Sequence, residues 1–209
     1  MKLNAAETLL VNNPVRGLVQ RFYEGRLLLE LGGRLDGARV LEAGCGRGLG
    51  AQVLLEQFGA SQVCAIDLDL RQVRRAQRRL RGYPHGRVVL AVGAGERLPF
   101  PDQCFDAVFD FGVLHHIPAW QMAVAEIRRV LKPHGRFFFE EVTKAALNRW
   151  VYRTFLKHPA QNRFSEAEFV AELKAHGIEL LQEPRRILAD DIFIGVGKLC
   201  ETSHAPAEQ

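Results

Sequence analysis

The sequence predicts an α/β domain built around a mostly parallel β-sheet. Short apolar runs bounded by glycine alternate with segments of helical periodicity, and no internal repeat or low-complexity block interrupts this alternation. A connection that contains a helix returns the chain in its original direction, so strands joined in this way pair in parallel. The 209 residues match the length of one domain, which is typically about 100–200 residues.

Composition excludes other classes of protein. Hydrophobic residues make up 47% of the chain and the formal net charge is +4, which is too apolar and too weakly charged for a disordered chain. No apolar run approaches the ~20 residues that span a bilayer. Residues 1–15 lack a basic cluster followed by a long apolar core. We therefore expect neither a transmembrane segment nor a signal peptide.

The four cysteines lie far apart and show no metal-ligand spacing: Cys45, Cys64, Cys104 and Cys200. We expect reduced thiols, no metal site and a cytoplasmic location. The pI of about 9.0 permits a nucleic-acid or anionic-membrane partner without requiring one.

Strands and helices alternate up to residue 142. The expected strands are residues 38–43, 62–67, 87–92, 105–111 and 136–142. The expected helices are residues 48–58, 69–81 and 118–131, after an N-terminal helix that Asn13 caps and Pro14 begins.

The last third of the chain departs from this alternation. Ser165 and Glu168 form an S-x-x-E capping box that predicts a helix. Strands are expected near 178–188 and 191–199, with no helix between them. These two strands should pair antiparallel through a short turn around Asp190.

The strongest signal for a ligand is the segment VLEAGCGRG at 40–48. A buried strand runs into Gly44, Gly46 and Gly48, and a helix follows, so a ligand can approach the backbone closely at a helix N-terminus. The dinucleotide fingerprint G-x-G-x-x-G is a related pattern. Here the third glycine comes one residue early, and Leu49 stands in its place.

Two carboxylates indicate the chemistry of that ligand. Glu42 precedes the loop, where it would repel a pyrophosphate and favour an ammonium or sulfonium group. Asp67 closes the second strand, where an acid can accept hydrogen bonds from a ribose diol. Together they suit S-adenosylmethionine, an adenosine with a cationic amino-acid arm. The alternative is a tight turn that binds nothing.

With these motifs the sequence resembles the class I S-adenosylmethionine-dependent methyltransferases, and most closely the branch typified by ubiquinone/menaquinone C-methyltransferases. The resemblance covers about residues 38–142, through VLEAGCGRG at 40–48, AIDLD at 65–69, ERLPFPDQCFDAV at 96–108, FGVLHHI at 111–117 and IRRVLKPHGRFFFEE at 127–141, and continues in FSEAEFVAELKAHGIEL at 164–180. It implies a three-layer sandwich around a seven-stranded, Rossmann-like sheet whose last strand is antiparallel. It also implies S-adenosylmethionine as the cofactor.

The resemblance implies further cofactor contacts. Leu68 would pack on the adenine, while Asp110 and Phe111 would lie near the methionine arm. The family often has an acid that holds the adenine amino group, but this chain has Ala94 at that place. Adenine selection would then depend on the backbone N–H of Gly95, and the lost hydrogen bond is worth roughly 0.5–1.5 kcal/mol.

A general base is needed only if the methyl acceptor must lose a proton. The candidates are His115 and His116 after the fourth strand, and Glu140 and Glu141 at the end of the fifth. Adjacent strand residues face opposite sides, so at most one glutamate should face the cleft, and the other should be a solvated or helix-pairing charge. We select His116 and Glu140, while packing and helix capping are the alternative role for both histidines.

We expect one domain over residues 1–199, with a helical cap over 1–36, a substrate lid over 144–164 and a flexible tail over 200–209. The lid would line an apolar acceptor site with aromatic side chains and meet an anionic end with basic ones; ordinary packing is the alternative. The aromatic candidates are Trp150, Tyr152, Phe155 and Phe164, and the basic ones are Arg149, Arg153, Lys157 and Arg163. On the N-terminal helix, Tyr23 and Arg16 are further candidates.

The acceptor is expected to be a small, partly apolar molecule. A nucleic-acid partner is disfavoured, because the arginines of helix 69–81 would form a solvated face away from the methyl group. DFGV also stands where DNA adenine and protein glutamine methyltransferases have N/D-P-P-Y/F. The alternatives are a cofactor-binding module without transfer activity, a lipid or RNA methyltransferase, and a nicotinamide-dependent oxidoreductase, which Glu42 and Leu49 disfavour. The acceptor atom and the oligomeric state stay open.

Overall fold

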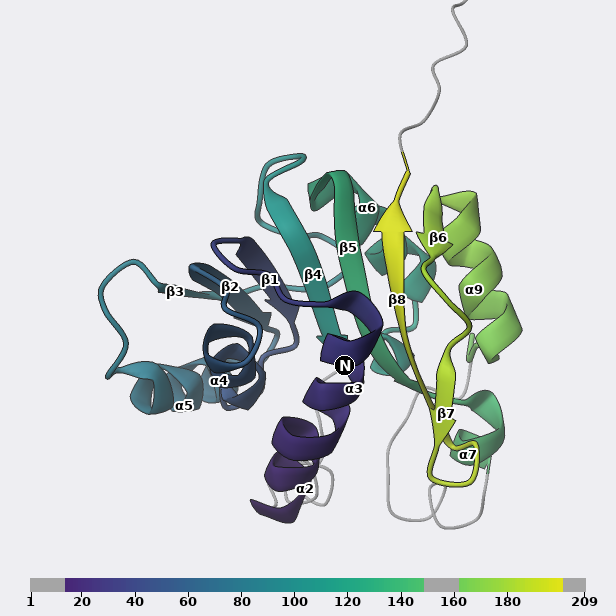
Figure 1. Cartoon of the computed structure of the whole chain (residues 1–209), viewed down its shortest axis with the longest axis horizontal. Coiled ribbons are helices and arrows are strands. Elements are labelled where there is room, and N and C mark those ends of the chain that lie inside the picture. The colour runs from purple at the N-terminus through teal and green to yellow at the C-terminus, as the bar shows by residue number, and fades with distance from the viewer. Residues whose placement is uncertain (1–13, 149–161, 201–209) are drawn as a thin grey trace, which may run out of the picture.

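The computed structural model describes residues 14–148 and 162–200, and it shows one mixed sheet with helices on both faces (Figure 1). The order across the sheet is β3 (Val88–Val92), β2 (Gln62–Asp67), β1 (Arg39–Ala43), β4 (Phe105–Phe111), β5 (Leu131–Val142), β8 (Ile192–Leu199) and β6 (Ile178–Leu180). The strands β1 to β5 are parallel, and β8 runs antiparallel between β5 and β6. The expected α/β sandwich with an antiparallel last strand is therefore confirmed.

The helices form the two outer layers. They are α2 (Pro14–Val19), the π-helical turn η1 (Gln20–Glu24), α3 (Gly25–Gly32), α4 (Leu49–Glu56), α5 (Leu70–Leu80), the 3-10 turn η2 (Leu114–His116), α6 (Trp120–Val130), α7 (Lys144–Asn148) and α9 (Glu166–Ala175). One hydrophobic core joins α3, α4 and α5 to the sheet, and a second joins α6 and α9 to its other face.

The edge beyond β8 differs from the sequence prediction. The strand expected over 178–188 is split into β6 and β7 (Arg185–Ile187), which pair with opposite ends of β8. Pro184 stands directly before β7, and proline cannot donate a ladder hydrogen bond. The two pieces occupy one position, so eight strands fill the seven positions that were expected.

Two other boundaries also move. Helix α6 begins at Trp120 rather than Pro118, because the backbone of Ala119, with φ -100° and ψ 49°, is not helical. The Pro118 carbonyl accepts a hydrogen bond from the Asn162 side chain at 2.6 Å. Strand β5 begins at Leu131, which pairs with Phe105 before a register shift. The capping box that begins α9 is confirmed, with both of its hydrogen bonds present.

Strands β4 and β5 are tied together by stacked aromatic rings. The rings of Phe109 and Phe138 are parallel within 8°, with centroids 4.3 Å apart, and Phe58 meets both edge-on. Such pairs add about 0.5–1.5 kcal/mol beyond burial. Because Phe109 and Phe138 lie directly opposite each other, this stack fixes the register that brings the two strand ends together.

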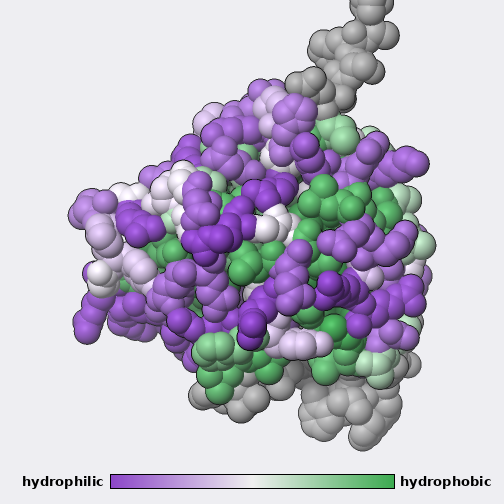
Figure 2. Space-filling view, viewed as in Figure 1, coloured by the Kyte–Doolittle hydropathy of each residue, from purple (hydrophilic) through white to green (hydrophobic). Residues whose placement is uncertain are grey.

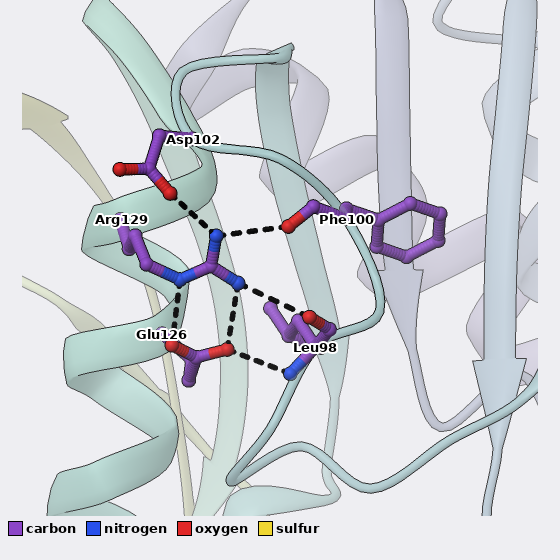
Figure 3. Close-up of polar contacts among 5 residues, drawn as sticks. All are labelled: Leu98, Phe100, Asp102, Glu126 and Arg129. Atoms are coloured by element: carbon purple, nitrogen blue, oxygen red, sulfur yellow. Dashed lines mark hydrogen bonds and ion pairs between the residues drawn. The ribbon is translucent and has the colours of Figure 1, made fainter.

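One guanidinium on α6 makes several of the hydrogen bonds that hold the loop before β4 (Figure 3). Arg129 donates to both carboxylate oxygens of Glu126, at 2.7 and 2.8 Å, and to the carbonyls of Phe100 and Leu98. It also pairs with Asp102 at 2.7 Å. Glu126 accepts from the backbone N–H of Leu98 at 2.7 Å, and the N–H of Gln103 donates to the carbonyl of Arg129 at 2.9 Å. The ion pair of Arg129 and Glu126 therefore positions residues 98–102, and a backbone hydrogen bond holds the end of the loop.

Replacing Arg129 by alanine should release this loop. The lost hydrogen bonds are partly exposed, so we expect a loss of about 1–2 kcal/mol in the free energy of unfolding, and a melting temperature lower by roughly 2–8 °C. Calorimetry gives the melting temperature, and limited proteolysis should cut within residues 97–103. Arg128→Ala, on the same helix and outside this network, is the control. Equal effects of the two variants would contradict the role of Arg129.

Candidate functional site

The candidate site lies where the parallel strands β1, β2, β4 and β5 end. The carboxyl ends of parallel strands meet at one edge of a sheet, and ligands of open α/β sheets bind there. This chain places a buried or half-buried acid at or near the end of each of these four strands: Glu42, Asp67, Asp110 and the pair Glu140 and Glu141.

The glycine loop between β1 and α4 has three left-handed glycines that differ in their surroundings. A Cβ on Gly44 would overlap Val113, and one on Gly48 would lie 2.9 Å from Leu80. A Cβ on Gly46 would meet no atom within 4 Å. Gly44 and Gly48 therefore serve the packing of the loop, whereas Gly46 borders open space that a ligand can fill.

Asp67 ties this loop to the end of β2. Its Oδ2 accepts the backbone N–H of Gly46 at 2.9 Å, and its Oδ1 accepts the N–H of Asp69 at 2.8 Å. Asp69 in turn caps α5 by accepting from the N–H of Arg71. Burial raises the pKa of Asp67, while these two backbone hydrogen bonds oppose that shift. Each carboxylate oxygen keeps a second acceptor direction.

Glu42 is 2% exposed and lies against α4. Burial raises its pKa well above the usual value, and the charge of Asp67 adds to the shift. Its Oε2 accepts no hydrogen bond from any residue that the structure describes. An isolated buried carboxylate is costly, so this position favours a cationic ligand group or a bound proton.

A second group of titratable side chains lies on the opposite face of the sheet, at the ends of β4 and β5. Glu141 is fully buried, and its Oε2 lies 2.6 Å from Nδ1 of His115. Its Oε1 accepts the N–H of Leu114 at 2.7 Å. Asp110 accepts the N–H of Val113 at 2.8 Å and shares a hydrogen bond with Glu141. Two acids thus hold the turn that contains η2.

Burial sets the charge state of this group. It raises the pKa of Asp110 well above the usual value, and the charge of Glu141 adds to that shift. It raises the pKa of Glu141 to about 7. Asp110 is therefore the neutral partner that donates to Glu141.

The selected residues His116 and Glu140 occupy different places near this group. Glu140 is buried on the other face of β5, the face that carries Phe138. His116 is partly buried, and its ring lies 4.2 Å from that of His115. Both glutamates are buried, so neither is a solvated charge, and the alternative expectation of a helix-pairing charge describes Glu141, which bonds Leu114 and His115 of η2. Sequence reasoning missed the partnership of Glu141 with His115, although alternation along β5 already separated the two glutamates.

The other expected cofactor contacts lie along the same edge. Leu68 follows Asp67 and is 43% exposed, and Phe111 is half-buried at the end of β4. Ala94 and Gly95 lie in the turn after β3, where a Cβ on Gly95 would come within 2.8 Å of Ile117. This close approach brings the turn against the segment that follows η2.

Most of the expected lid lies outside the described residues: Trp150, Tyr152, Phe155, Arg149, Arg153 and Lys157. The side chain of Arg16 also lies outside them. Phe164 is described, and it does not line an open site. Its ring stacks on Phe169 and contacts Trp120 within the core. Arg163 donates to the carbonyl of Leu147 at 3.3 Å.

The arginines of α5 point outward as expected. Arg71 pairs with Asp69 at 2.7 Å, and Arg79 donates to the carbonyl of Arg47 in the glycine loop. Within residues 14–148 and 162–200, no three His, Cys, Asp or Glu side chains are grouped to hold a metal ion. The described helices include none with the length and apolarity of a membrane span.

Residues 41–139 match the family described as "Methyltransferase domain". Two similar curated proteins act on acyl compounds by name. They are the fatty-acid O-methyltransferase of Mycolicibacterium smegmatis, 34% identical over 51% of this chain and 38% of that protein, and the malonyl-[acyl-carrier protein] O-methyltransferase of Herminiimonas arsenicoxydans, 34% identical over 68% of this chain and 53% of that protein. These matches support a class I S-adenosylmethionine-dependent methyltransferase.

Two further proteins extend the comparison. A phthiotriol/phenolphthiotriol dimycocerosates methyltransferase of Mycobacterium ulcerans is 31% identical over 75% of this chain and 56% of that protein. The chain thus spans about half the length of the curated methyltransferases it matches. A solved S-adenosylmethionine-dependent methyltransferase from Aquifex aeolicus superposes with a TM-score of 0.73 over 95% of this chain and 100% of that chain, at 20% identity. That likeness confirms the methyltransferase fold.

The residues of the glycine loop fit S-adenosylmethionine. The open space at Gly46 accommodates a ligand against the backbone, and the Oε2 atom of Glu42 suits an ammonium group. A pyrophosphate would bring negative charge to the same carboxylate.

Gly46→Val should abolish binding of S-adenosylhomocysteine while the protein stays folded, because the added side chain fills the open space. Titration calorimetry and a thermal melt check the two parts. A non-glycine residue in the left-handed region costs roughly 1–2 kcal/mol by itself. Gly86→Val is therefore the matched control, since Gly86 is also left-handed with no atom near its Cβ position. Normal affinity in Gly46→Val would refute the assignment of the loop.

Binding of a cationic ligand at Glu42 should release a proton. Burial raises the pKa of Glu42 in the empty protein, and a ligand ammonium lowers it again. Between these two pKa values affinity rises with pH, and it levels off above the higher one. Calorimetry with S-adenosylhomocysteine in two buffers of different ionisation enthalpy measures the proton. Glu42→Gln should bind about tenfold or more weakly and release less. Equal proton release from both proteins would exclude Glu42 as its source.

Proposed function

We propose that this protein transfers a methyl group from S-adenosylmethionine to a small, partly apolar acceptor. Two features at the end of β1 carry the proposal: the buried carboxyl of Glu42, and the open space beside Gly46 in the loop that follows. The cofactor supplies an activated methyl group on a sulfonium. The protein then gains much of its rate from binding and orientation, which well-placed groups supply without a metal.

Residues at the strand ends would each contact one part of the cofactor. Glu42 meets the ammonium group, and the second acceptor directions of Asp67 meet the ribose diol. Leu68 packs on the adenine, and the N–H of Gly95 takes over part of the selection that Ala94 cannot supply. The remaining members of the proposed cofactor site are Gly44, Gly48, Asp110 and Phe111.

The apolar character of the acceptor has two supports. The similar curated proteins include methyltransferases named for fatty-acid and lipid substrates. The N-terminal helix also exposes Leu18, Phe22 and Tyr23. A Cβ on Gly17 of this helix would lie 2.9 Å from the side chain of Leu49, directly after the glycine loop. Figure 2 shows this apolar area over α2 as one of several on this face. The closer likeness to ubiquinone/menaquinone C-methyltransferases, with a quinone-like acceptor, remains part of this proposal.

For an acceptor that must lose a proton, the groups proposed from the sequence are His116 and Glu140. Both lie near the ends of β4 and β5, and an imidazole is the side chain whose unperturbed pKa is nearest to neutral pH. A cytoplasmic location, one domain over residues 1–199 and the absence of a nucleic-acid partner also belong to the proposal.

The second candidate function is binding of the cofactor without methyl transfer. It is favoured by a solved structure named as the [4+2]-cyclase SpnF, which superposes with a TM-score of 0.68 over 84% of this chain and 79% of that chain, at 25% identity. A protein with this fold can therefore carry another activity. The missing acid at Ala94 is the further support from this chain.

Calorimetric titration with S-adenosylhomocysteine and with NAD tests the cofactor. We expect binding of the first and none of the second, and the reverse would establish an oxidoreductase. A screen of long-chain acids, alcohols, phenols and quinols with radiolabelled S-adenosylmethionine then tests transfer. A labelled product supports a methyltransferase. Tight cofactor binding with no product across the panel supports the second candidate.

A further inference from the structure

Two acids and an imidazole are buried together at the ends of β4 and β5, and the proposed function gives the group no role beyond the part of Asp110 in the cofactor site. Glu141 and Asp110 accept three hydrogen bonds from the turn after β4, including the 2.6 Å contact of Glu141 with Nδ1 of His115. Burying two carboxyls is expensive, and a turn can be fixed by neutral side chains at lower cost. This arrangement therefore suggests a chemical role for the group.

Above about pH 7 the pair holds one shared proton, because the pKa of Glu141 is raised to about 7 and that of Asp110 is raised well above its usual value. Burial raises the pKa of both acids, more so for Asp110, and like charges at one place resist joint ionisation. His115 of η2 faces the pair, and the ring of His116 contacts the ring of His115, with centroids 4.2 Å apart. The buried Asp191 lies just before β8. Such coupled groups titrate as a unit rather than one by one.

The pair also selects the tautomer of His115. An ionised Glu141 accepts a hydrogen bond, so the Nδ1 atom that faces it carries a proton. In the neutral ring the lone pair is then on Nε2. The Cε1 atom of this ring lies 3.6 Å from the Cβ position of Gly112, directly after β4. The ring therefore lies at the carboxyl edge of the sheet, beside the proposed cofactor site.

The buried acids at the carboxyl edge of the sheet also favour a hydroxyl acceptor over a carboxylate acceptor. Glu42, Asp110, Glu140 and Glu141 are all buried here. An ionised Glu141 on the same face as His115 would repel a carboxylate acceptor, and such an acceptor has no proton to lose at neutral pH. A hydroxyl group brings no charge, and it needs a base.

We propose that Asp110, Glu141 and His115 form one proton-accepting unit that serves a neutral hydroxyl acceptor, with Nε2 of His115 as the accepting atom. The inference rests on the proposed methyl transfer. The hydroxyl oxygen forms its bond to the methyl carbon as the carbon–sulfur bond breaks, and the electron pair of that bond stays on sulfur. The hydroxyl proton passes to Nε2, and Glu141 stabilises the resulting imidazolium. His115 is thus the catalytic residue, and the two acids are positioning residues.

The tautomer is tested first, by nitrogen NMR of histidine-labelled full chain saturated with S-adenosylhomocysteine. We expect His115 to carry its proton on Nδ1, and Glu141→Gln to reverse this, because the amide donates where the carboxylate accepted. His115→Asn assigns the signal. A proton on Nε2 in the unchanged protein, or no reversal in Glu141→Gln, would overturn the proposal.

Transfer is tested with two probes that share a tail, 4-nonylphenol and 4-nonylbenzoic acid. We expect methylation of the phenol and not of the acid. His115→Asn keeps a donor toward Glu141 but lacks the accepting atom, so turnover should fall about 10²-fold or more while S-adenosylhomocysteine affinity changes less than about twofold. His176→Asn is the control, because His176 forms a similar pair with Glu172 at 3.1 Å away from the site.

Further variants separate the members of the unit. Asp110→Asn keeps the donor toward Glu141 and should retain more turnover than Asp110→Ala. Glu141→Gln should remove the acidic limb of the pH–rate profile, since turnover falls at low pH when the unit is already protonated. His116→Gln should lose less turnover than His115→Asn.

Failure takes distinct forms. A preference for the benzoic acid, cofactor binding with neither probe methylated, or unchanged turnover in His115→Asn would overturn this inference. The proposed function itself fails if S-adenosylhomocysteine does not bind, or if it binds and no acceptor of the wider panel is methylated.

Discussion

The site depends on one constraint: parallel strands bring the ends of β1, β2, β4 and β5 to a single edge. Each of these strands carries an acid near its end, and the flanking helices and the glycine loop keep these acids away from bulk water. Desolvation raises the pKa of Glu42, Asp67, Asp110 and Glu141. The edge is thus a place where protons are held and where a positive charge is stabilised. Both properties suit the proposed cofactor, S-adenosylmethionine, which carries a positive charge on sulfur.

The two faces of the sheet separate these tasks. Glu42 faces α4, where the glycine loop leaves open space at Gly46. Asp110 and Glu141 face the side of α6 and α9, where they hold the turn with His115. Alternation along the strands produces this separation, because neighbouring residues point to opposite faces. The stacked rings of Phe109 and Phe138 keep β4 and β5 in the register that aligns the two acids.

Local signals made much of the fold predictable. The capping box of Ser165, the glycine loop and the strand ends depend on residues close in sequence, and their positions agree with the structure to within a few residues. The partner of Glu141 could not be predicted in this way, because it depends on how the turn after β4 folds over β5. The same holds for Phe164, whose aromatic ring suits a lid as well as a core. Only the contacts with Trp120 and Phe169 decide between the two. The split at Pro184 was readable in principle, since proline cannot donate to a strand ladder.

The place of β8 has a consequence for biosynthesis. This strand lies between β5 and β6, although about fifty residues separate β5 from β8 along the chain. While the ribosome has released residues only as far as β5, that strand is an unpaired edge, and exposed edges recruit other strands. The glycine loop can be complete at that stage, but Glu140 and Glu141 still lack the neighbouring strand that helps to exclude water from them. Translation of the C-terminal strand therefore closes the sheet and finishes the acid cluster in the same event.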